Sequence, residues 1–236
     1  MGTSVEGSGR TTAAFFDLDK TIIARSSTLA FAPSFYRHGL ITRGQVCRGA
    51  VAQLSFRLAG ASHDRMERIR DQVSALCCGW PADVVAQIVT DGLRQTIVPH
   101  VYAEARSLLA RHLQDGHDVI IVSTSGQEIA GPIGAMLGAT EVIATRLEVS
   151  NGRYTGSVAF YAYGQAKADH VSALAANRGY QLADCFAYSD SVTDLPLLEL
   201  VGHPHVVNAD RSLRKVARAR RWPELTFRQT DRAPVA

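Results

Sequence analysis

The chain has 236 residues, 46% of them hydrophobic, which is enough to bury a core as one large domain or as a domain that carries an insert. The formal net charge of +3 is small, and much of the basic excess lies in residues 211–221. Because Leu213, Val216 and Ala217 are interleaved with those charges, we expect a helix with a solvated basic face there rather than a nucleic-acid-binding surface.

The four cysteines show none of the spacings expected of a zinc site or a disulfide framework. We therefore expect a reducing, cytoplasmic compartment. Residues 1–12 are rich in Gly, Ser and Thr and lack an apolar core, which is unlike a signal peptide or a membrane span. We expect this segment to form a disordered tail.

The first predicted strand is the apolar run 13–16, and two carboxylates, Asp17 and Asp19, follow where the strand would end. In an open parallel sheet, that end is where ligands bind. Two carboxylates this close repel each other unless one is protonated or a cation lies between them. The pair therefore suggests a divalent metal, an acid/base pair, or both, although a polar turn leaving a strand would look the same.

Between residues 40 and 100 no convincing strand is predicted. Ser26 and Ser27 can cap a helix that begins near Thr28. Three apolar stripes at helical spacing follow, the second N-capped by Ser62 and the third with Pro81 in its first turn. The stripes are Val46, Ala50, Val51, Leu54 and Leu58, then Met66, Ile69, Val73 and Leu76, and then Val84, Val85, Ile88 and Leu93.

After Pro99 the pattern alternates between helices and strands, which implies a parallel sheet with right-handed crossovers. Asn151 and Gly152 indicate a β-hairpin within this part. The predicted fold class is α/β, a Rossmann-like doubly wound parallel sheet interrupted once by the helical insert. The expected helices are 102–114, 127–137, 166–178 and 195–201, and the expected strands are 119–122, 142–145, 185–188 and 205–208.

Polar residues at the predicted strand ends and helix starts suit one reaction. Transfer of a phosphoryl group to a carboxylate needs metal ligands, a lysine and a hydroxyl that hold the phosphate oxygens, an aspartate that attacks phosphorus, and a second that carries the proton. The chain offers Asp17 and Asp19 after the first strand, Ser123 after the second, Lys167 at a helix start, and Asp190 and Asp194 after the strand 185–188.

The segments 17–21 (Asp-Leu-Asp-Lys-Thr), 121–123 (Ile-Val-Ser) and 189–194 (Ser-Asp-Ser-Val-Thr-Asp), together with Lys167, resemble the four motifs of the haloacid dehalogenase-like hydrolase superfamily. The helical insert resembles the cap of its phosphoserine phosphatase-like branch (subfamily IB type). The resemblance implies a Rossmann-like catalytic core of residues 13–28 and 100–236 and an all-helical cap domain of residues 29–99. Further similarity lies in 144–149, 152–156 and 207–210.

The resemblance also implies the chemistry. Asp17 would be the nucleophile that forms an aspartyl phosphate, and Asp19 would act as general acid and then as general base. Mg²⁺ would be held by the Asp17 and Asp190 side chains and the Asp19 main-chain carbonyl, with Asp194 supporting it directly or through water. Because superfamily members without the second aspartate are not phosphatases of this kind, Asp19 favours phosphate-ester hydrolysis over dehalogenation.

Ser123, with the N–H that follows it, and Lys167 would bind the substrate phosphate by the same resemblance. Each also has an ordinary structural interpretation. Ser123 could only cap the next helix, Lys167 could be an exposed helix residue, and Asp194 could be the N-cap of the helix that begins at Leu195. Thr193 stands where many relatives have Asn, which departs from the family pattern.

The substrate is less closely indicated. Phosphoserine phosphatases place a glutamate shortly after the first motif to hold the substrate amine, and the matching residue here is Ser26. Replacing a carboxylate partner of a cation with a hydroxyl should cost about 2–5 kcal/mol, so phosphoserine is a poor first candidate. Arg57, Arg68 and Arg70 could bind a second anionic group or could be ordinary exposed helix charges.

Three functions from different classes follow. The first is a Mg²⁺-dependent phosphatase of a small phosphorylated alcohol, polyol or other metabolite. The second is phosphoserine phosphatase proper, and the third is a non-catalytic or nucleic-acid-binding module that uses residues 211–221. The intact Asp17 and Asp19 pair argues against the third, so we expect a small-molecule phosphate ester as partner and no nucleic acid. We also expect no membrane span. Nothing in the sequence indicates an oligomeric state.

Overall fold

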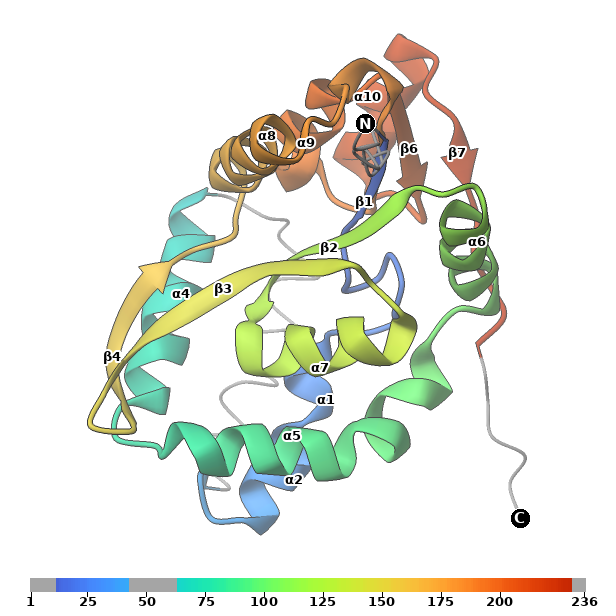
Figure 1. The fold of residues 1–236 in the computed structure, drawn as a ribbon. Coiled ribbons are helices and arrows are strands. Elements are labelled where there is room, and N and C mark those ends of the chain that lie inside the picture. The colour runs from blue at the N-terminus through green and yellow to red at the C-terminus, as the bar shows by residue number, and fades with distance from the viewer. Residues whose placement is uncertain (1–11, 43–62, 231–236) are drawn as a thin grey trace, which may run out of the picture.

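The structure, a computed structural model, describes residues 12–42 and 63–230. In these ranges the chain forms one seven-stranded sheet with the strand order β4-β3-β2-β1-β5-β6-β7 (Figure 1). All neighbouring pairs are parallel except β3 and β4, which form an antiparallel hairpin. The strands are β1 (Ala13–Phe16), β2 (Asp118–Gly126), β3 (Glu141–Ser150), β4 (Arg153–Phe160), β5 (Phe186–Ser189), β6 (His203–Val207) and β7 (Glu224–Leu225).

Helices cover both faces of the sheet, as the doubly wound prediction requires (Figure 1). They are α1 (Ser27–Ala30), α2 (Ala32–Arg37), α4 (His63–Cys77), α5 (Ala82–Ile97), α6 (Ala103–Gln114), α7 (Gln127–Leu137), α8 (Gln165–Arg178), α9 (Leu195–Leu200) and α10 (Arg211–Arg220). Short 3₁₀ turns occur at Val98–His100, Leu182–Asp184 and Val192–Asp194.

Strand β1 lies at the centre of the sheet and separates two hydrophobic clusters. Successive strand residues point to opposite faces, so Phe15 joins one cluster and Phe16 the other. The cluster of Phe15 contains residues of α8, α9 and α10, and the cluster of Phe16 contains residues of α5, α6 and α7. All four β1 residues are buried. The apolar run therefore forms a strand buried on both faces, which is typical of a parallel sheet.

The register brings the carboxyl ends of three strands to one edge of the sheet. Phe16 is paired with Ile121 of β2 and with Tyr188 of β5. Residues that follow these positions therefore lie close together, although they are far apart in the sequence. The α/β prediction is confirmed by this mostly parallel sheet.

The predicted hairpin turn at Asn151 and Gly152 is present, with φ values of 48° and 73°. Positive φ at both central residues is typical of a type I′ turn, which matches the twist of the flanking strands. Strand β4 lies beside α4 (Figure 1), and the Gly79 N–H donates to the Tyr154 carbonyl at 2.8 Å. The hairpin is thereby connected to the helical region.

Several local predictions were wrong. The sequence predicted no strand after 205–208, whereas the two-residue strand β7 follows and pairs with β6. Pro81 precedes the first residue of α5 rather than lying in its first turn. Val73 is 40% exposed whereas Ser74 is buried, so the predicted apolar stripe does not describe that turn of α4. Val84 is 38% exposed as well.

Other expectations concern parts of the chain outside the described residues. These are the tail 1–12, apart from residue 12, the first apolar stripe at 46–58, and Ser62 as an N-cap. The division into a core of 13–28 and 100–236 and a cap of 29–99 stays a prediction. Within 12–42 and 63–230, no helix has both the length and the apolar composition needed to cross a membrane.

Candidate active site

The six predicted site residues line one cavity of about 130 Å³ at the carboxyl edge of the sheet. Four parts of the chain contribute these residues. Two residues follow β1, one lies in the second half of β2, two follow β5, and one lies in the first turn of α8. Five other residues complete the lining. The predicted residues are Asp17, Asp19, Ser123, Lys167, Asp190 and Asp194, and the others are Lys20, Thr124, Tyr163, Ser191 and Thr193.

Asp17 extends the central strand by one residue, since its N–H donates to the Tyr188 carbonyl of β5 at 2.9 Å. Its carboxylate Oδ1 accepts a hydrogen bond from Lys167 Nζ at 2.8 Å. Burial raises the pKa of Asp17 to about 6, and the Lys167 ammonium acts in the opposite direction. Asp17 is therefore held mainly as a carboxylate at neutral pH.

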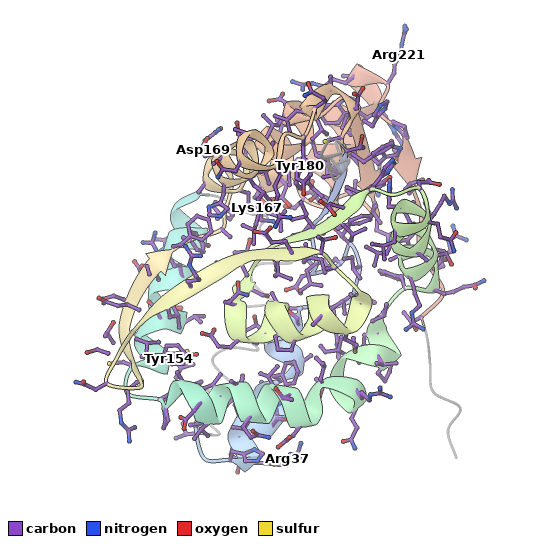
Figure 2. All side chains as sticks on the ribbon, in the orientation of Figure 1. Arg37, Tyr154, Lys167, Asp169, Tyr180 and Arg221 are labelled. Atoms are coloured by element: carbon purple, nitrogen blue, oxygen red, sulfur yellow. The ribbon has the colours of Figure 1, made fainter. Side chains whose placement is uncertain are left out.

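Lys167 is a buried helix residue, with 1% of its surface exposed, and not the exposed lysine that the sequence left open. Its Nζ donates to Asp17 and also to Asp194 Oδ2 at 3.0 Å. Figure 2 labels Lys167 between α8 and the sheet. Burial alone would lower the pKa of Lys167, but Asp17 and Asp194 outweigh it and raise the pKa. The ammonium therefore stays charged.

Asp194 stands at the N-cap position of α9 but makes no side-chain capping bond there. Instead, its Oδ2 accepts hydrogen bonds from Lys167 and from Ser189 Oγ, the latter at 2.8 Å. Its side chain thus orients Lys167. Ser189 lies in the segment 189–194, where the sequence indicates no role for it, and only the fold places its hydroxyl against Asp194.

Asp19 is held by two serines that sequence reasoning did not assign to the site. The Ser27 N–H donates to Oδ1 at 2.9 Å, and Ser125 Oγ donates to Oδ2 at 3.1 Å. The two serine hydroxyls also lie 2.9 Å apart. Burial raises the pKa of Asp19, and the hydrogen bonds from Ser27 and Ser125 oppose that rise. The result is an oriented carboxyl group with a raised pKa.

Ser26 caps a helix, whereas Ser123 does not. Ser26 is the N-cap of α1, with its Oγ accepting from the Leu29 N–H at 3.4 Å, and Ser27 is the first helical residue. Ser123 is buried and accepts from the Ser125 N–H at 3.1 Å. Helix α7 has Gly126 as its N-cap, without a side-chain capping bond, so Ser123 is not its cap.

Asp190 is also buried, and its pKa is raised well above the ordinary value, first by burial and then by the Asp17 carboxylate. A fifth aspartate, Asp210, holds the loop that carries Asp190. The Asp210 N–H donates to the Asp190 carbonyl at 2.8 Å, and Asp210 Oδ2 accepts from the Val192 N–H at 2.9 Å. Asp210 lies in a motif of the resemblance, but the sequence indicated no role for it.

The arrangement fits a divalent cation held by few side chains. The Asp17 carboxylate raises the pKa of Asp190, so a cation near both would relieve their repulsion. Asp19 and Asp194 already use carboxylate oxygens in the hydrogen bonds described above. Among the described residues, no group of three His, Cys, Asp or Glu side chains forms a complete metal site. Mg²⁺ is usually bound by one or two carboxylates together with water and phosphate oxygens, and the residues suit that kind of site.

The predicted arginine contacts do not all appear in the structure. Arg57 lies outside the described residues, and Arg68 is exposed. Arg70 is ion-paired with Asp71, at 2.7 Å between Nη2 and Oδ1. Neither Arg68 nor Arg70 is among the residues that line the cavity.

Residues 14–199 match the model of the haloacid dehalogenase-like hydrolase family. The chain belongs to this family. A Mycobacterium tuberculosis protein named probable phosphatase is 53% identical over 228 residues, covering 95% of this chain and 79% of that protein. A Streptomyces azureus protein named inhibition of morphological differentiation protein is 55% identical over 222 residues, covering 94% and 80%.

Solved structures share the fold of this chain. A Bordetella pertussis protein of unknown function has a TM-score of 0.79 and 26% identity, with 92% of this chain and 98% of that chain covered. A substrate-bound phosphoserine phosphatase has a TM-score of 0.66 at 17% identity, with 94% of each chain covered, and it shows the shared fold. The predicted resemblance to the haloacid dehalogenase-like hydrolases, and to phosphoserine phosphatase within them, is confirmed.

Proposed function

We propose that this hydrolase is a Mg²⁺-dependent phosphatase that cleaves a small phosphomonoester through an aspartyl phosphate on Asp17. The observation that carries the proposal is the buried contact between Lys167 and Asp17 inside a cavity lined otherwise by hydroxyls, carboxylates and Lys20. A lysine in this position both orients a nucleophilic carboxylate and offers a positive charge to a phosphate. The M. tuberculosis relative named probable phosphatase supports the same reaction.

In the first half-reaction, an Asp17 carboxylate oxygen attacks phosphorus, and the bond from phosphorus to the ester oxygen breaks. The leaving alkoxide receives a proton from Asp19. Burial raises the pKa of both aspartates. The Lys167 ammonium favours the ionised form of Asp17, as a nucleophile needs, and the raised pKa of Asp19 suits a group that gives and takes a proton.

In the second half-reaction, the Asp19 carboxylate accepts a proton from a water molecule as that water attacks phosphorus. The bond from phosphorus to the Asp17 oxygen breaks, the Asp17 carboxylate is restored, and inorganic phosphate leaves. Asp19 is oriented for both steps by the Ser27 N–H and the Ser125 hydroxyl.

The phosphate is bound by Lys167, by Ser123 and by the N–H that follows Ser123. A Mg²⁺ ion would be held by the Asp17 and Asp190 carboxylates and the Asp19 main-chain carbonyl, with support from Asp194. When bound, it supplies positive charge that neutralises the phosphate oxygens. In the absence of a cation, the carboxylates and the phosphate dianion would repel one another.

Residues 29–99 form, in this proposal, the cap that selects the leaving group. Phosphoserine ranks behind phosphorylated alcohols and polyols, because Ser26 offers a hydroxyl where an ammonium would need a carboxylate, and that hydroxyl already caps α1. The ion pairs of helix α10 favour an enzyme over a nucleic-acid-binding module. Arg214 and Arg218 lie 3.6 and 3.2 Å from the Glu224 carboxylate, which offsets part of its basic charge.

The test is phosphate release from a panel of p-nitrophenyl phosphate, phosphoserine, sugar and polyol phosphates and glycerol phosphates, with Mg²⁺ and with EDTA. We expect metal-dependent release from at least one ester by the wild-type protein and none by Asp17→Asn. Release that is unaffected by EDTA would remove the metal from the proposal. No release from any ester with Mg²⁺ would contradict the proposed activity.

A further inference from the structure

One wall of the candidate site is aromatic. Apart from Tyr163, the cavity lining in the described parts of the chain consists of carboxylates, hydroxyls and lysines. Tyr163 lies four residues before Lys167, and the Lys167 N–H donates to the Gly164 carbonyl between them at 3.2 Å. Gly164 has a φ of 54°, which L side chains rarely adopt, so a specific turn sets the position of Tyr163.

A second ring supports Tyr163. The rings of Tyr161 and Tyr163 are stacked, with centroids 5.4 Å apart and planes inclined by 19°. The Arg70 guanidinium of α4 lies 5.4 Å from the Tyr161 ring centroid and is held by Asp71. The stack therefore runs from the cavity to α4, which makes the Tyr163 ring a fixed surface.

The aromatic wall is electrically neutral. Burial, followed by the Asp194 carboxylate, raises the pKa of Tyr163, so its phenol stays protonated at neutral pH. The charge of Arg70 is paired with Asp71, at 2.7 Å. A phosphate dianion is therefore expected to bind to Lys167 and Ser123, and the uncharged part of a substrate is expected to pack against Tyr163.

We propose that Tyr163 is the surface on which the leaving group stacks, and that the substrates are phosphomonoesters of alcohols that carry a planar unsaturated ring. This inference rests on the proposed phosphatase activity and names the substrate class for the same site. A planar ring stacks on tyrosine in an offset or edge-to-face arrangement, whereas a polyol or an aliphatic amino acid has no such surface.

Benzyl phosphate and cyclohexylmethyl phosphate test the proposal, because both release a primary alcohol and differ in whether the ring is planar. The ratio of kcat/KM for benzyl phosphate to kcat/KM for cyclohexylmethyl phosphate in the wild-type protein should be about 3–10, the range that a single aromatic pair supplies. Equal values for the two esters would overturn the inference.

Two variants separate the ring from the hydroxyl. Tyr163→Phe keeps the ring and should keep the ratio, whereas Tyr163→Leu should reduce the ratio to about 1. A leucine variant that retains the wild-type ratio would overturn the inference, and the wild-type ratio stands as a test even if that variant does not fold. Phosphate release without a preference for benzyl phosphate would contradict this inference but not the phosphatase activity. No release from these esters or from p-nitrophenyl phosphate contradicts the phosphatase activity, and the inference with it.

Discussion

Lys167 Nζ lies 2.8 Å from Asp17 Oδ1, although the two residues are 150 positions apart in the sequence. Both side chains are buried, so neither charge is stabilised by bulk water. The contact therefore connects catalysis to stability, because the same pair that positions the nucleophile also balances the charge of the site.

Asp17→Asn should abolish turnover and preserve the fold. The amide cannot attack phosphorus, and removal of one negative charge reduces repulsion with Asp190 while Lys167 keeps its contact with Asp194. In EDTA, the free energy of unfolding at pH 7 should be equal to or higher than that of the wild type. Phosphate release and urea denaturation measure the two effects.

Asp169→Asn is the matched control for that variant. Asp169 is exposed on α8 and accepts a hydrogen bond from Gln165 Nε2 at 2.9 Å, away from the cavity lining (Figure 2). The turnover of the Asp169→Asn protein should stay close to that of the wild type. An active Asp17→Asn protein would contradict the assignment of the nucleophile.

Lys167→Met should destabilise the protein by about 3–5 kcal/mol at neutral pH, because it leaves two buried carboxylates without their cation. The loss should be smaller near pH 4, which is below the pKa of about 6 of Asp17, so that this carboxylate can accept a proton. The exposed Lys215 on α10 provides the control, and Lys215→Met should change the free energy of unfolding by less than about 0.5 kcal/mol. Equal losses in the two variants would contradict the structural role of Lys167.

Ser125→Ala should lower kcat about 10–100-fold for an alkyl phosphate, since a hydrogen bond to a charged group contributes about 1.5–3 kcal/mol and this one orients Asp19. The first step with p-nitrophenyl phosphate should be less affected, because nitrophenolate leaves without a proton. Ser107→Ala on α6 is the control, as its hydroxyl is exposed and donates to the Ala103 carbonyl. Similar losses in the rate of the first step for both substrates, measured before the intermediate is hydrolysed, would show that Ser125 does not act through Asp19.

His112 should make stability depend on pH. It is buried at 5% exposure, its Nδ1 lies 2.9 Å from His117 Nδ1, and its Nε2 lies 2.9 Å from the Tyr188 hydroxyl. Burial, followed by His117, lowers the pKa of His112 from 6.5 to about 4. Between these values the unfolded state binds more protons, so this contribution is present above pH 6.5 and is lost as the pH falls towards 4.

The measurement is urea denaturation at several pH values between 4.5 and 6.5, the window set by these pKa values. As the pH is lowered, the contribution of His112 should decrease the free energy of unfolding of the wild type by up to about 1.4 kcal/mol per pH unit. His112→Phe should reduce that slope, even if it lowers stability overall. An unchanged slope in the variant would contradict the lowered pKa of His112.

The sequence allowed the strand ends to be predicted because their signals are local. Asp17 and Asp19 directly follow an apolar run, and the hairpin residues Asn151 and Gly152 have their own conformational preference. Ser125 could not be assigned in this way, because its role depends on Asp19, 106 positions away. The phase of α4 at Val73 was missed for a related reason, since its contact with β4 sets which side is buried. Strand β7 has two residues, too few to form a pattern.

The most direct test of the account is to trap the covalent intermediate. Asp19→Asn should still form an aspartyl phosphate from p-nitrophenyl phosphate, because that leaving group needs no proton, but it should hydrolyse the intermediate slowly because no base activates water. We expect a burst of nitrophenol in the presence of Mg²⁺, and mass spectrometry after acid quenching should find the phosphoryl group on Asp17. Turnover without any phosphorylated protein, or a phosphoryl group on another residue, would contradict Asp17 as the nucleophile.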